Sequence, residues 1–282
     1  MEAINKFRAD LKAGRTCLGA SVSLSDPLVS EALCDSVDFL WIDLEHSPMS
    51  PEALNGHLLA ARGKRIPALV RVAAAFTPLI KGALDSGAEG IIVPQVRSVT
   101  EVRQVVNDCR YPPQGLRGYG PRVPSGYGRH GGRAFSEQEN RDVFVSVMIE
   151  TAEALAALDD ILAIPGLDSI VIGPQDLSFS LGYPGDPEDP HVVSAIDTII
   201  AKARAAGRYV GAGMGASAAY AHDLAQRGVQ WLQVGGDCDL MRLHFELVRA
   251  DFHRLHTAAS VKAPARIPVE RPAEPQIGDD AP

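Results

Sequence analysis

Residues 143–181 read VFVSVMIETAEALAALDDILAIPGLDSIVIGPQDLSFSL, and this stretch decides the fold. An apolar, β-rich run over 143–149 ends in Glu150, a helical segment follows, and a second apolar run over 169–172 leads to Asp176. Strand, crossover helix and strand make a βαβ unit, in which the two strands are parallel. Both strands therefore end at the same edge of the sheet, which places the two carboxylates side by side.

Two carboxylates that leave buried strands together repel each other unless positive charge lies between them. Burying both acids without a cation is costly, so Glu150 and Asp176 are predicted metal ligands rather than structural acids. Oxygen ligands with open positions for water and substrate favour a hard divalent ion, Mg²⁺ or Mn²⁺, with Co²⁺ as a further candidate. Zinc would normally bring His or Cys ligands.

The same βα pattern repeats on both sides of this unit. Eight predicted strands, nearly all separated by helices, lie within about 235 residues, which indicates an α/β fold of the (β/α)8 TIM-barrel type. A doubly wound open sheet is the alternative, but the chain has no GxGxxG at a first βα turn and no Walker motif. The predicted strands cover residues 17–24, 39–45, 68–72, 90–96, 143–149, 169–172, 209–214 and 230–234.

Length and composition fit one domain with a substantial core, because the chain has 282 residues and is 46% hydrophobic. We predict a single barrel domain over residues 1–260 that closes with a C-terminal helix. Residues 263–282 are rich in Pro, Ala and acidic residues and are predicted to form a disordered tail.

The net charge and the spacing of the cysteines limit which partners and which cellular compartment we expect for this protein. The net charge of −8 argues against nucleic acid or an anionic membrane surface as a partner. No apolar run approaches the ~20 residues of a membrane helix, and the charged first helix is not a signal peptide. The four cysteines form no CxxC pair, so we expect them to be reduced in the cytoplasm.

Polar groups cluster where the second and third predicted strands end, the edge at which barrel enzymes carry their chemistry. Period-2 alternation puts Trp41, Asp43 and Glu45 on one face and apolar residues on the other. The apolar face must meet the helices, so the acids are expected to point into the barrel mouth beside His46. The third strand adds Arg71.

Each of these residues also has a simpler structural explanation. Asp43 and Glu45 could be halves of structural ion pairs, and Arg71 could merely neutralise the acids. A histidine at a strand end often only caps or packs. His46 lies beside two acids, however, which favours a functional role.

The absence of lysine from the ends of the predicted strands limits the chemistry that the site can perform. None of the six lysines ends an apolar strand, and both a Schiff base and pyridoxal phosphate require a buried, desolvated amine. We therefore expect no Schiff-base lysine and no PLP. Carbonyl chemistry in this chain is expected to use the metal ion as its electron sink.

The segment 111–133 is rich in glycine and arginine. It could form a lid or rim with cationic groups for an acidic substrate, or it could be a solvated surface loop. Arg117, inside the tight Leu-Arg-Gly-Tyr-Gly sequence, is the candidate for a role in the site.

Five stretches together resemble the HpcH/HpaI aldolase family, the metal-dependent class II pyruvate aldolases. They are FLWIDLEHSP (39–48), ALVRV (68–72), RYPPQGLRGYGPR (110–122), VMIET (147–151) and IVIGPQDLSFSLGYPG (170–185). The resemblance covers roughly residues 5–255. It implies a modified (β/α)8 barrel of the phosphoenolpyruvate/pyruvate superfamily, assembled as a homohexamer that exchanges the C-terminal helix.

The resemblance also implies a reaction, which is reversible cleavage of a 4-hydroxy-2-oxo acid to pyruvate and an aldehyde through a pyruvate enolate. The resemblance implies that Glu150 and Asp176 bind the metal, that Arg71 binds pyruvate and stabilises the enolate, and that His46 is the general acid/base. It also implies that the backbone of Gln175 and Asp176 holds the substrate carboxylate. Asp85 would raise the basicity of the histidine of a neighbouring subunit, and Asp43, Glu45 and Arg117 would surround the site.

Two positions depart from the family pattern beside the predicted ligands. The chain has Met148 where the best-known aldolases carry Gln, and Gln175 where they carry a small residue. The departures leave the reaction type intact and put the aldehyde partner in question. Two other functions remain open: a citryl-CoA or malyl-CoA type lyase, and a non-catalytic barrel that binds a 2-oxo acid.

Overall fold

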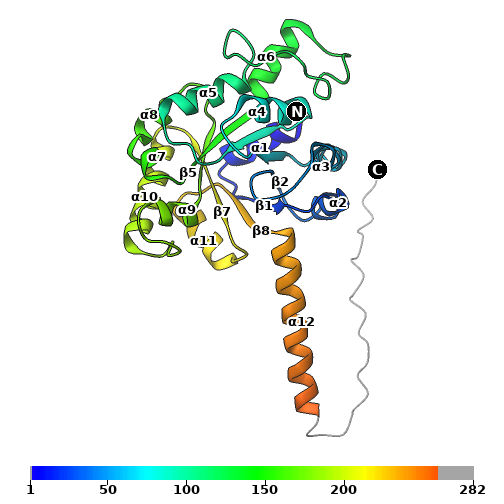
Figure 1. Ribbon diagram of the computed structural model, residues 1–282, viewed down its shortest axis with the longest axis vertical. Helices are drawn as coiled ribbons and strands as arrows, with labels where there is room; N and C mark the ends of the chain where they lie inside the picture. The colour runs from blue at the N-terminus through cyan, green and yellow to red at the C-terminus, as the bar shows by residue number, and fades with distance from the viewer. Residues whose placement is uncertain (1, 260–282) are drawn as a thin grey trace. The chain divides into compact units, whose positions relative to one another are not determined.

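The computed structural model describes residues 2–259. Eight parallel strands close into a barrel in chain order, and helices surround them (Figure 1). The (β/α)8 prediction is thereby confirmed. The strands are β1 (Cys17–Val22), β2 (Phe39–Asp43), β3 (Ala68–Arg71), β4 (Gly90–Val93), β5 (Phe144–Ile149), β6 (Ser169–Ile172), β7 (Tyr209–Met214) and β8 (Trp231–Gly236).

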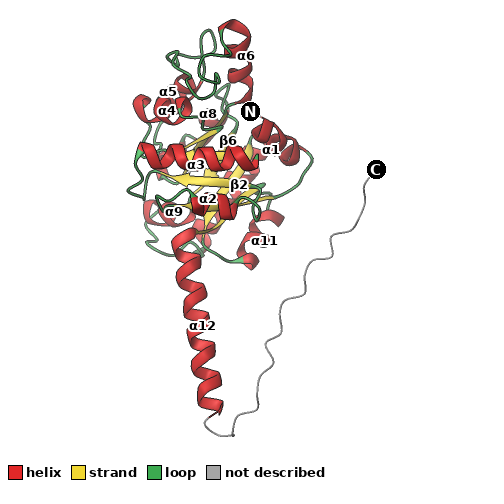
Figure 2. Ribbon diagram, turned by 90° about the vertical axis from the view of Figure 1, so that its right-hand side faces the viewer, coloured by secondary structure: helices red, strands yellow, loops and turns green. Residues whose placement is uncertain are grey.

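Twelve helices lie within the described residues, and Figure 2 shows those of the barrel packed around its strands. They are α1 (Glu2–Lys12), α2 (Leu28–Leu33), α3 (Pro51–Lys64), α4 (Thr77–Asp85), α5 (Val99–Cys109), α6 (Gly132–Asp142), α7 (Ala152–Ala156), α8 (Leu158–Leu162), α9 (Pro174–Ser180), α10 (Pro190–Ala205), α11 (Ala218–Gln226) and α12 (Asp237–Ala259). None of them is long and apolar enough to cross a membrane.

The chain divides after Leu240 into two units. The first contains the barrel, and the second, up to residue 259, continues α12. The single-domain boundary at residue 260 stays a prediction, and the predicted tail at 263–282 lies outside the described residues.

Successive side chains along each strand point alternately into the barrel and toward the helices, so the core has an inner and an outer layer. The inner layer fills the barrel with side chains such as Phe39, Phe144 and Trp231, all fully buried. The outer layer joins the other strand face to the helices. Burying each such large apolar side chain contributes about 1.5–3 kcal/mol relative to leaving it exposed. The predicted inward face of β2 is confirmed, because Trp41 belongs to the inner layer while its neighbours in the strand belong to the outer one.

Helix α1 supplies the inner layer with Ile4, Phe7 and Leu11. The Phe7 ring makes edge contacts with Phe39, at 5.5 Å between ring centroids, and with Phe144, at 5.6 Å. These contacts fill most of the barrel interior with apolar groups. The small Ser146 hydroxyl, in the middle of β5, is satisfied by donating to the Ile91 carbonyl at 2.8 Å.

Local capping signals explain where several helices begin or end. Ser50 begins α3 by accepting a hydrogen bond from the Ala53 N–H, with Pro51 at the first helical position. The helix ends at Arg65, which has the left-handed φ of 56°. Thr151 caps α7 in the same way as Ser50 caps α3, through the Ala154 N–H.

The structure adds two helices that the sequence did not indicate. Helix α9 begins at Pro174, in a stretch read only as the end of a strand, and α6 begins near the end of the glycine-rich segment. The α6 sequence, GRAFSEQENRD, has too few apolar residues to show a helical stripe. The single helix expected between β5 and β6 is split into α7 and α8.

Candidate active site

The ends of β2 and β3 hold Arg71 in a fixed orientation. Asp43 and Arg71 are partners in the parallel ladder. The Arg71 Nε donates to Asp43 Oδ1 at 2.8 Å and its NH2 to Oδ2 at 2.7 Å, so the pair is bidentate. The guanidinium also lies over the Trp41 ring, 5.4 Å from its centroid. The arginine is thus clamped by a buried carboxylate and an aromatic face.

Glu45 and His46 follow β2 directly and complete this group. Glu45 Oε2 lies 3.0 Å from Arg71 NH1 and 3.6 Å from the Nε2 of His46. The Glu45 carboxyl is mostly buried, whereas the His46 side chain is 64% exposed. The histidine can therefore reach solvent or a ligand while a carboxylate touches its inner side.

Glu150 ends β5 on the same edge of the barrel and is buried. Its Oε1 accepts the backbone N–H of Gln95 at 2.7 Å and the side-chain Nε2 of Gln95 at 3.2 Å. Its Oε2 lies against Gly173, at the end of β6, where a Cβ would stand 2.2 Å from that oxygen. Only glycine leaves room for this carboxylate.

Asp176 and Gln175 occupy the first turn of α9, immediately after β6, and both are exposed. Strands β5 and β6 pair with Ile149 opposite Ile172, so Asp176 follows the strand next to that of Glu150. Burial is the main cause of the raised pKa of Glu150 and of Glu45, and the negative charge of Asp176 adds to both. The Gln175 amide lies close to Gly185, in the loop after α9. The two predicted ligands therefore share one corner of the barrel mouth, with Gln175 at its rim.

Burial dominates the electrostatics of this corner. Desolvation raises the pKa of Glu150 to about 7, the Gln95 hydrogen bond opposes that rise, and the charge of Asp176 adds to it. Desolvation likewise raises the pKa of Glu45, against the attraction of Arg71. Burial lowers the pKa of Arg71, but the hydrogen bond and charge of Asp43 outweigh it, so the net shift is upward. The four acids Asp43, Glu45, Glu150 and Asp176 share one arginine, so the group is short of positive charge.

A divalent cation fits this deficit. Glu150 and Asp176 supply hard oxygen donors, and the missing Cβ of Gly173 allows Glu150 Oε2 to keep its position. Among residues 2–259 no three His, Cys, Asp or Glu side chains gather as a preformed metal site. Two carboxylates alone would leave most coordination positions of a bound ion to water and substrate.

Two predicted residues lie in a different group. Arg117 is buried, donates from NH2 to Asp85 Oδ1 at 3.1 Å and from NH1 to Glu139 Oε2 at 3.4 Å, and covers the Tyr111 ring at 4.6 Å. Both Asp85 and Arg117 thus have partners within the protomer other than the strand-end acids. The effect of Asp85 on a histidine of a neighbouring subunit stays a prediction.

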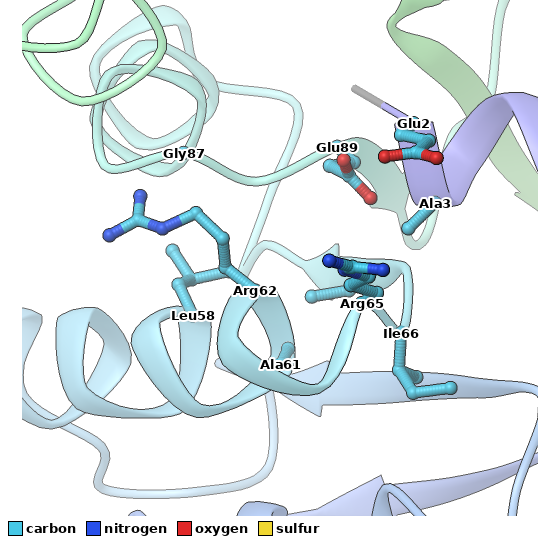
Figure 3. A pocket seen from close by; sticks show the side chains of 10 residues that line it. Glu2, Ala3, Leu58, Ala61, Arg62, Arg65, Ile66, Gly87 and Glu89 are labelled. Atoms are coloured by element: carbon cyan, nitrogen blue, oxygen red, sulfur yellow. The ribbon is translucent and has the colours of Figure 1, made fainter.

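A separate pocket of about 280 Å³ opens at the other end of the strands (Figure 3). Ile66 and Ala68 line it where β3 begins, and Glu89 lines it just before β4. Arg62 and Arg65 reach it from the end of α3. Burial raises the pKa of Glu89 to about 7. Because barrel chemistry belongs to the opposite edge, we do not assign the reaction to this pocket.

The sequence analysis gave no role to Gln95 or Gly173, which shape the Glu150 carboxylate. The only signals were their places at strand ends, in Pro94-Gln95 and Ile172-Gly173. The sequence shows a glycine at 173, but it does not show which atom lies where the Cβ would be, or which backbone N–H donates to the carboxylate.

Comparison with known proteins gives consistent matches along most of the chain. Residues 21–243 match a family described as HpcH/HpaI aldolase/citrate lyase. A 4-hydroxy-2-oxovalerate aldolase of Rhodococcus jostii (strain RHA1) is 36% identical over 88% of this chain and 96% of the relative. A 4-hydroxy-2-oxo-heptane-1,7-dioate aldolase of Salmonella dublin is 34% identical over 88% of this chain and 94% of the relative.

The solved structures agree. The crystal structure of an HpcH/HpaI aldolase from Desulfitobacterium hafniense DCB-2 superposes with a TM-score of 0.81 at 27% identity, over 87% of this chain and 95% of that one. The family match over residues 21–243 includes the strand ends described above.

Proposed function

Because the chain belongs to the HpcH/HpaI aldolase/citrate lyase family, we propose that it is a metal-dependent pyruvate aldolase, a carbon–carbon lyase. It cleaves a 4-hydroxy-2-oxo acid reversibly to pyruvate and an aldehyde through a pyruvate enolate. The observation that carries the proposal is the meeting of the Arg71–Asp43 pair with the Glu150 and Asp176 carboxylates at one barrel corner.

Glu150 and Asp176 hold a divalent ion, Mg²⁺ or Mn²⁺. When bound, this ion supplies a Lewis acid for the 2-oxo group and its neighbouring carboxylate. The backbone at the start of α9, residues Gln175 and Asp176, receives the substrate carboxylate.

Arg71 binds the pyruvate part of the substrate and offsets negative charge at the enolate oxygen. The two Asp43 hydrogen bonds hold its guanidinium in place before the substrate arrives. Pre-orientation of this kind lowers the cost of reaching the transition state.

His46 takes the proton of the C4 hydroxyl, the C3–C4 bond breaks, and the electron pair passes into the enolate, whose C3 is then protonated. The Glu45 carboxylate, 3.6 Å from Nε2, stabilises the imidazolium that forms. The chemistry needs no Schiff-base lysine and no PLP.

The specificity for the aldehyde is assigned to Met148 and Gln175. Met148 is buried in the inner layer, and its methyl group lies close to Gly173, below the Glu150 carboxylate. Gln175 stands at the rim beside Gly185. The apolar Met148 side chain inside the barrel and the Gln175 amide at the rim together favour an aldehyde that is polar at one end only.

We further propose a homo-oligomer, a hexamer, that works in the cytoplasm and exchanges α12 between subunits. Phe245, Val248, Phe252 and Leu255 recur at helical spacing on α12 and are exposed. The barrel offers a groove of about 520 Å³, lined by small and apolar residues of β1, β8 and α11. An apolar helix of a second copy suits such a groove.

The proposal is tested by following exchange of the C3 protons of pyruvate in D₂O by NMR, with metal-stripped protein and added Mg²⁺ or Mn²⁺. We expect metal-dependent exchange that is lost in Glu150→Ala and Arg71→Ala and kept in the matched control Arg129→Ala, which alters an exposed loop arginine. Exchange without added metal, or in the Glu150 variant, would contradict the ligand assignment.

Two further outcomes separate the other functions. Pyruvate binding without exchange would favour a non-catalytic barrel that binds 2-oxo acids. Cleavage of citryl-CoA or malyl-CoA, with no reaction of pyruvate, would favour a CoA-thioester lyase.

A further inference from the structure

Gln95 has a backbone conformation that residues other than glycine rarely adopt. It follows β4 and Pro94 with a φ of 54°, in the left-handed region. Holding a residue with a Cβ there costs free energy, and such residues persist where the surrounding structure requires them. The question is what the conformation of Gln95 achieves.

Both hydrogen-bond donors of Gln95 reach the same atom. The backbone N–H donates to Glu150 Oε1 at 2.7 Å, and the side-chain Nε2 donates to that oxygen at 3.2 Å. The second oxygen, Oε2, lies over Gly173. One residue therefore fixes one oxygen of the carboxylate and leaves the other for a ligand.

The strand ends have a separate connection that does not involve Gln95. Thr151 donates from Oγ1 to the Val96 carbonyl at 2.9 Å, so the loop after β4 stays joined to the residue after Glu150. The bonds of Gln95 are thus not needed to hold these two loops together, which leaves the orientation of Glu150 as their effect.

We infer that Gln95 is a positioning residue, which holds the Glu150 carboxylate so that Oε2 is ready to bind a divalent cation. The inference rests on the proposed metal-dependent function. Groups that orient a metal ligand commonly change metal affinity by 10–100-fold when they are replaced. Gln95 acts through Glu150 and needs no contact with the cation or the substrate.

The test measures the Kd for Mn²⁺ from the EPR signal of the free ion, using full-length protein. We expect Gln95→Leu, which keeps the side-chain volume and the backbone N–H but removes the side-chain donor, to weaken Mn²⁺ binding by about tenfold. Gln95→Gly relieves the left-handed conformation and also removes the side-chain donor, so it should weaken binding similarly even if the leucine variant folds poorly.

Arg65→Gly is the matched control. Arg65 also has a left-handed φ, 56°, but it lies at the end of α3, away from the strand ends that hold the acids. This variant should keep the wild-type Kd for Mn²⁺. A weakening in both Gln95→Gly and Arg65→Gly would overturn the inference, because relief of backbone strain would then explain it.

A second readout separates positioning from general damage. The Mg²⁺ concentration that gives half-maximal pyruvate exchange should rise about tenfold in Gln95→Leu, with the rate at saturating Mg²⁺ reduced by less than about threefold. A Kd for Mn²⁺ within twofold of wild type in both Gln95 variants would show the inference to be wrong.

The Glu150→Gln variant distinguishes a failure of the proposed metal site from a failure of the proposed role of Gln95. If this variant loses Mn²⁺ binding while the Gln95 variants keep it, the metal site stands and only the role of Gln95 fails. If Glu150→Gln binds Mn²⁺ like the wild type, the proposed metal site itself fails, and the inference about Gln95 fails with it.

Discussion

At the scale of single residues, the role of Arg71 depends on the planar shape of its guanidinium as well as on its charge. Its charge offsets the nearby acids, but its planar shape also allows the two parallel hydrogen bonds to Asp43 and the contact with the Trp41 face. A lysine would keep the charge and lose both. The residue therefore allows charge and shape to be tested separately.

We predict that Arg71→Lys lowers kcat/KM for aldol cleavage by on the order of 10²-fold, because the remaining cation is no longer aligned. The protein should stay folded, since the inner layer below it is unchanged. Steady-state kinetics and circular dichroism measure the two effects. Arg129→Lys is the control, and a loss of less than threefold in Arg71→Lys would mean that charge alone suffices.

Gly173 gives a second prediction at this scale. In Gly173→Ala the new Cβ would stand 2.2 Å from Glu150 Oε2, so the carboxylate must move. We expect turnover to fall by on the order of 10²-fold and stability to fall by about 1–3 kcal/mol. Gly63→Ala, where a Cβ meets nothing within 4 Å, is the control. Wild-type turnover in Gly173→Ala would show that the orientation of Glu150 is not important.

At the scale of elements, the loop before β4 carries a half-buried acid, Glu89, whose titration makes the stability of the fold depend on pH. Desolvation raises the pKa of Glu89 from 4.5 to about 7 in the folded protein. The folded state therefore binds the proton more tightly than the unfolded state between these values. The free energy of unfolding then decreases as pH rises from about 4.5 to about 7, and the full penalty is present above 7.

We predict that Glu89→Gln removes up to one proton from this dependence, which is at most about 1.4 kcal/mol per pH unit. Urea unfolding at pH 5, 6, 7 and 8 measures the slope. The variant should gain stability relative to wild type as the pH rises. Glu153→Gln, at an exposed acid with a lowered pKa, should not show this gain. An unchanged slope in Glu89→Gln would assign the dependence to other groups.

The positions of the strands could be predicted from the sequence more accurately than the hydrogen bonds and ion pairs between side chains. All eight strands start within one residue of their predicted positions, because apolar runs and helix caps are local signals. The Arg71 and Glu150 groups were found because parallel strands must end at one edge. The double hydrogen bond of Gln95 and the pairing of Arg117 with Asp85 could not be found, because they depend on backbone torsions and on a loop that shows no periodicity.

For the whole molecule, the apolar side of α12 gives the testable feature. We predict that the double variant Phe245→Glu, Phe252→Glu lowers the oligomer mass in light scattering, because it puts two charges on the face proposed to be buried by another subunit. Arg242→Glu, on the same helix, is the control. Activity should fall with dissociation if Asp85 of a neighbour serves His46. An unchanged mass in the double variant would contradict the exchange of α12.

The long loop between α5 and α6 separates the site into two halves along the chain. Arg71 and the acids after β2 come before it, whereas Glu150 and Asp176 come after it. The pairing of β4 with β5 and the Gln95–Glu150 hydrogen bonds connect the two sides. A chain cut in this loop would therefore give two catalytically silent fragments, each with half of the required chemistry. Recovery of turnover on mixing them would report on how well the two halves of the barrel recognise each other.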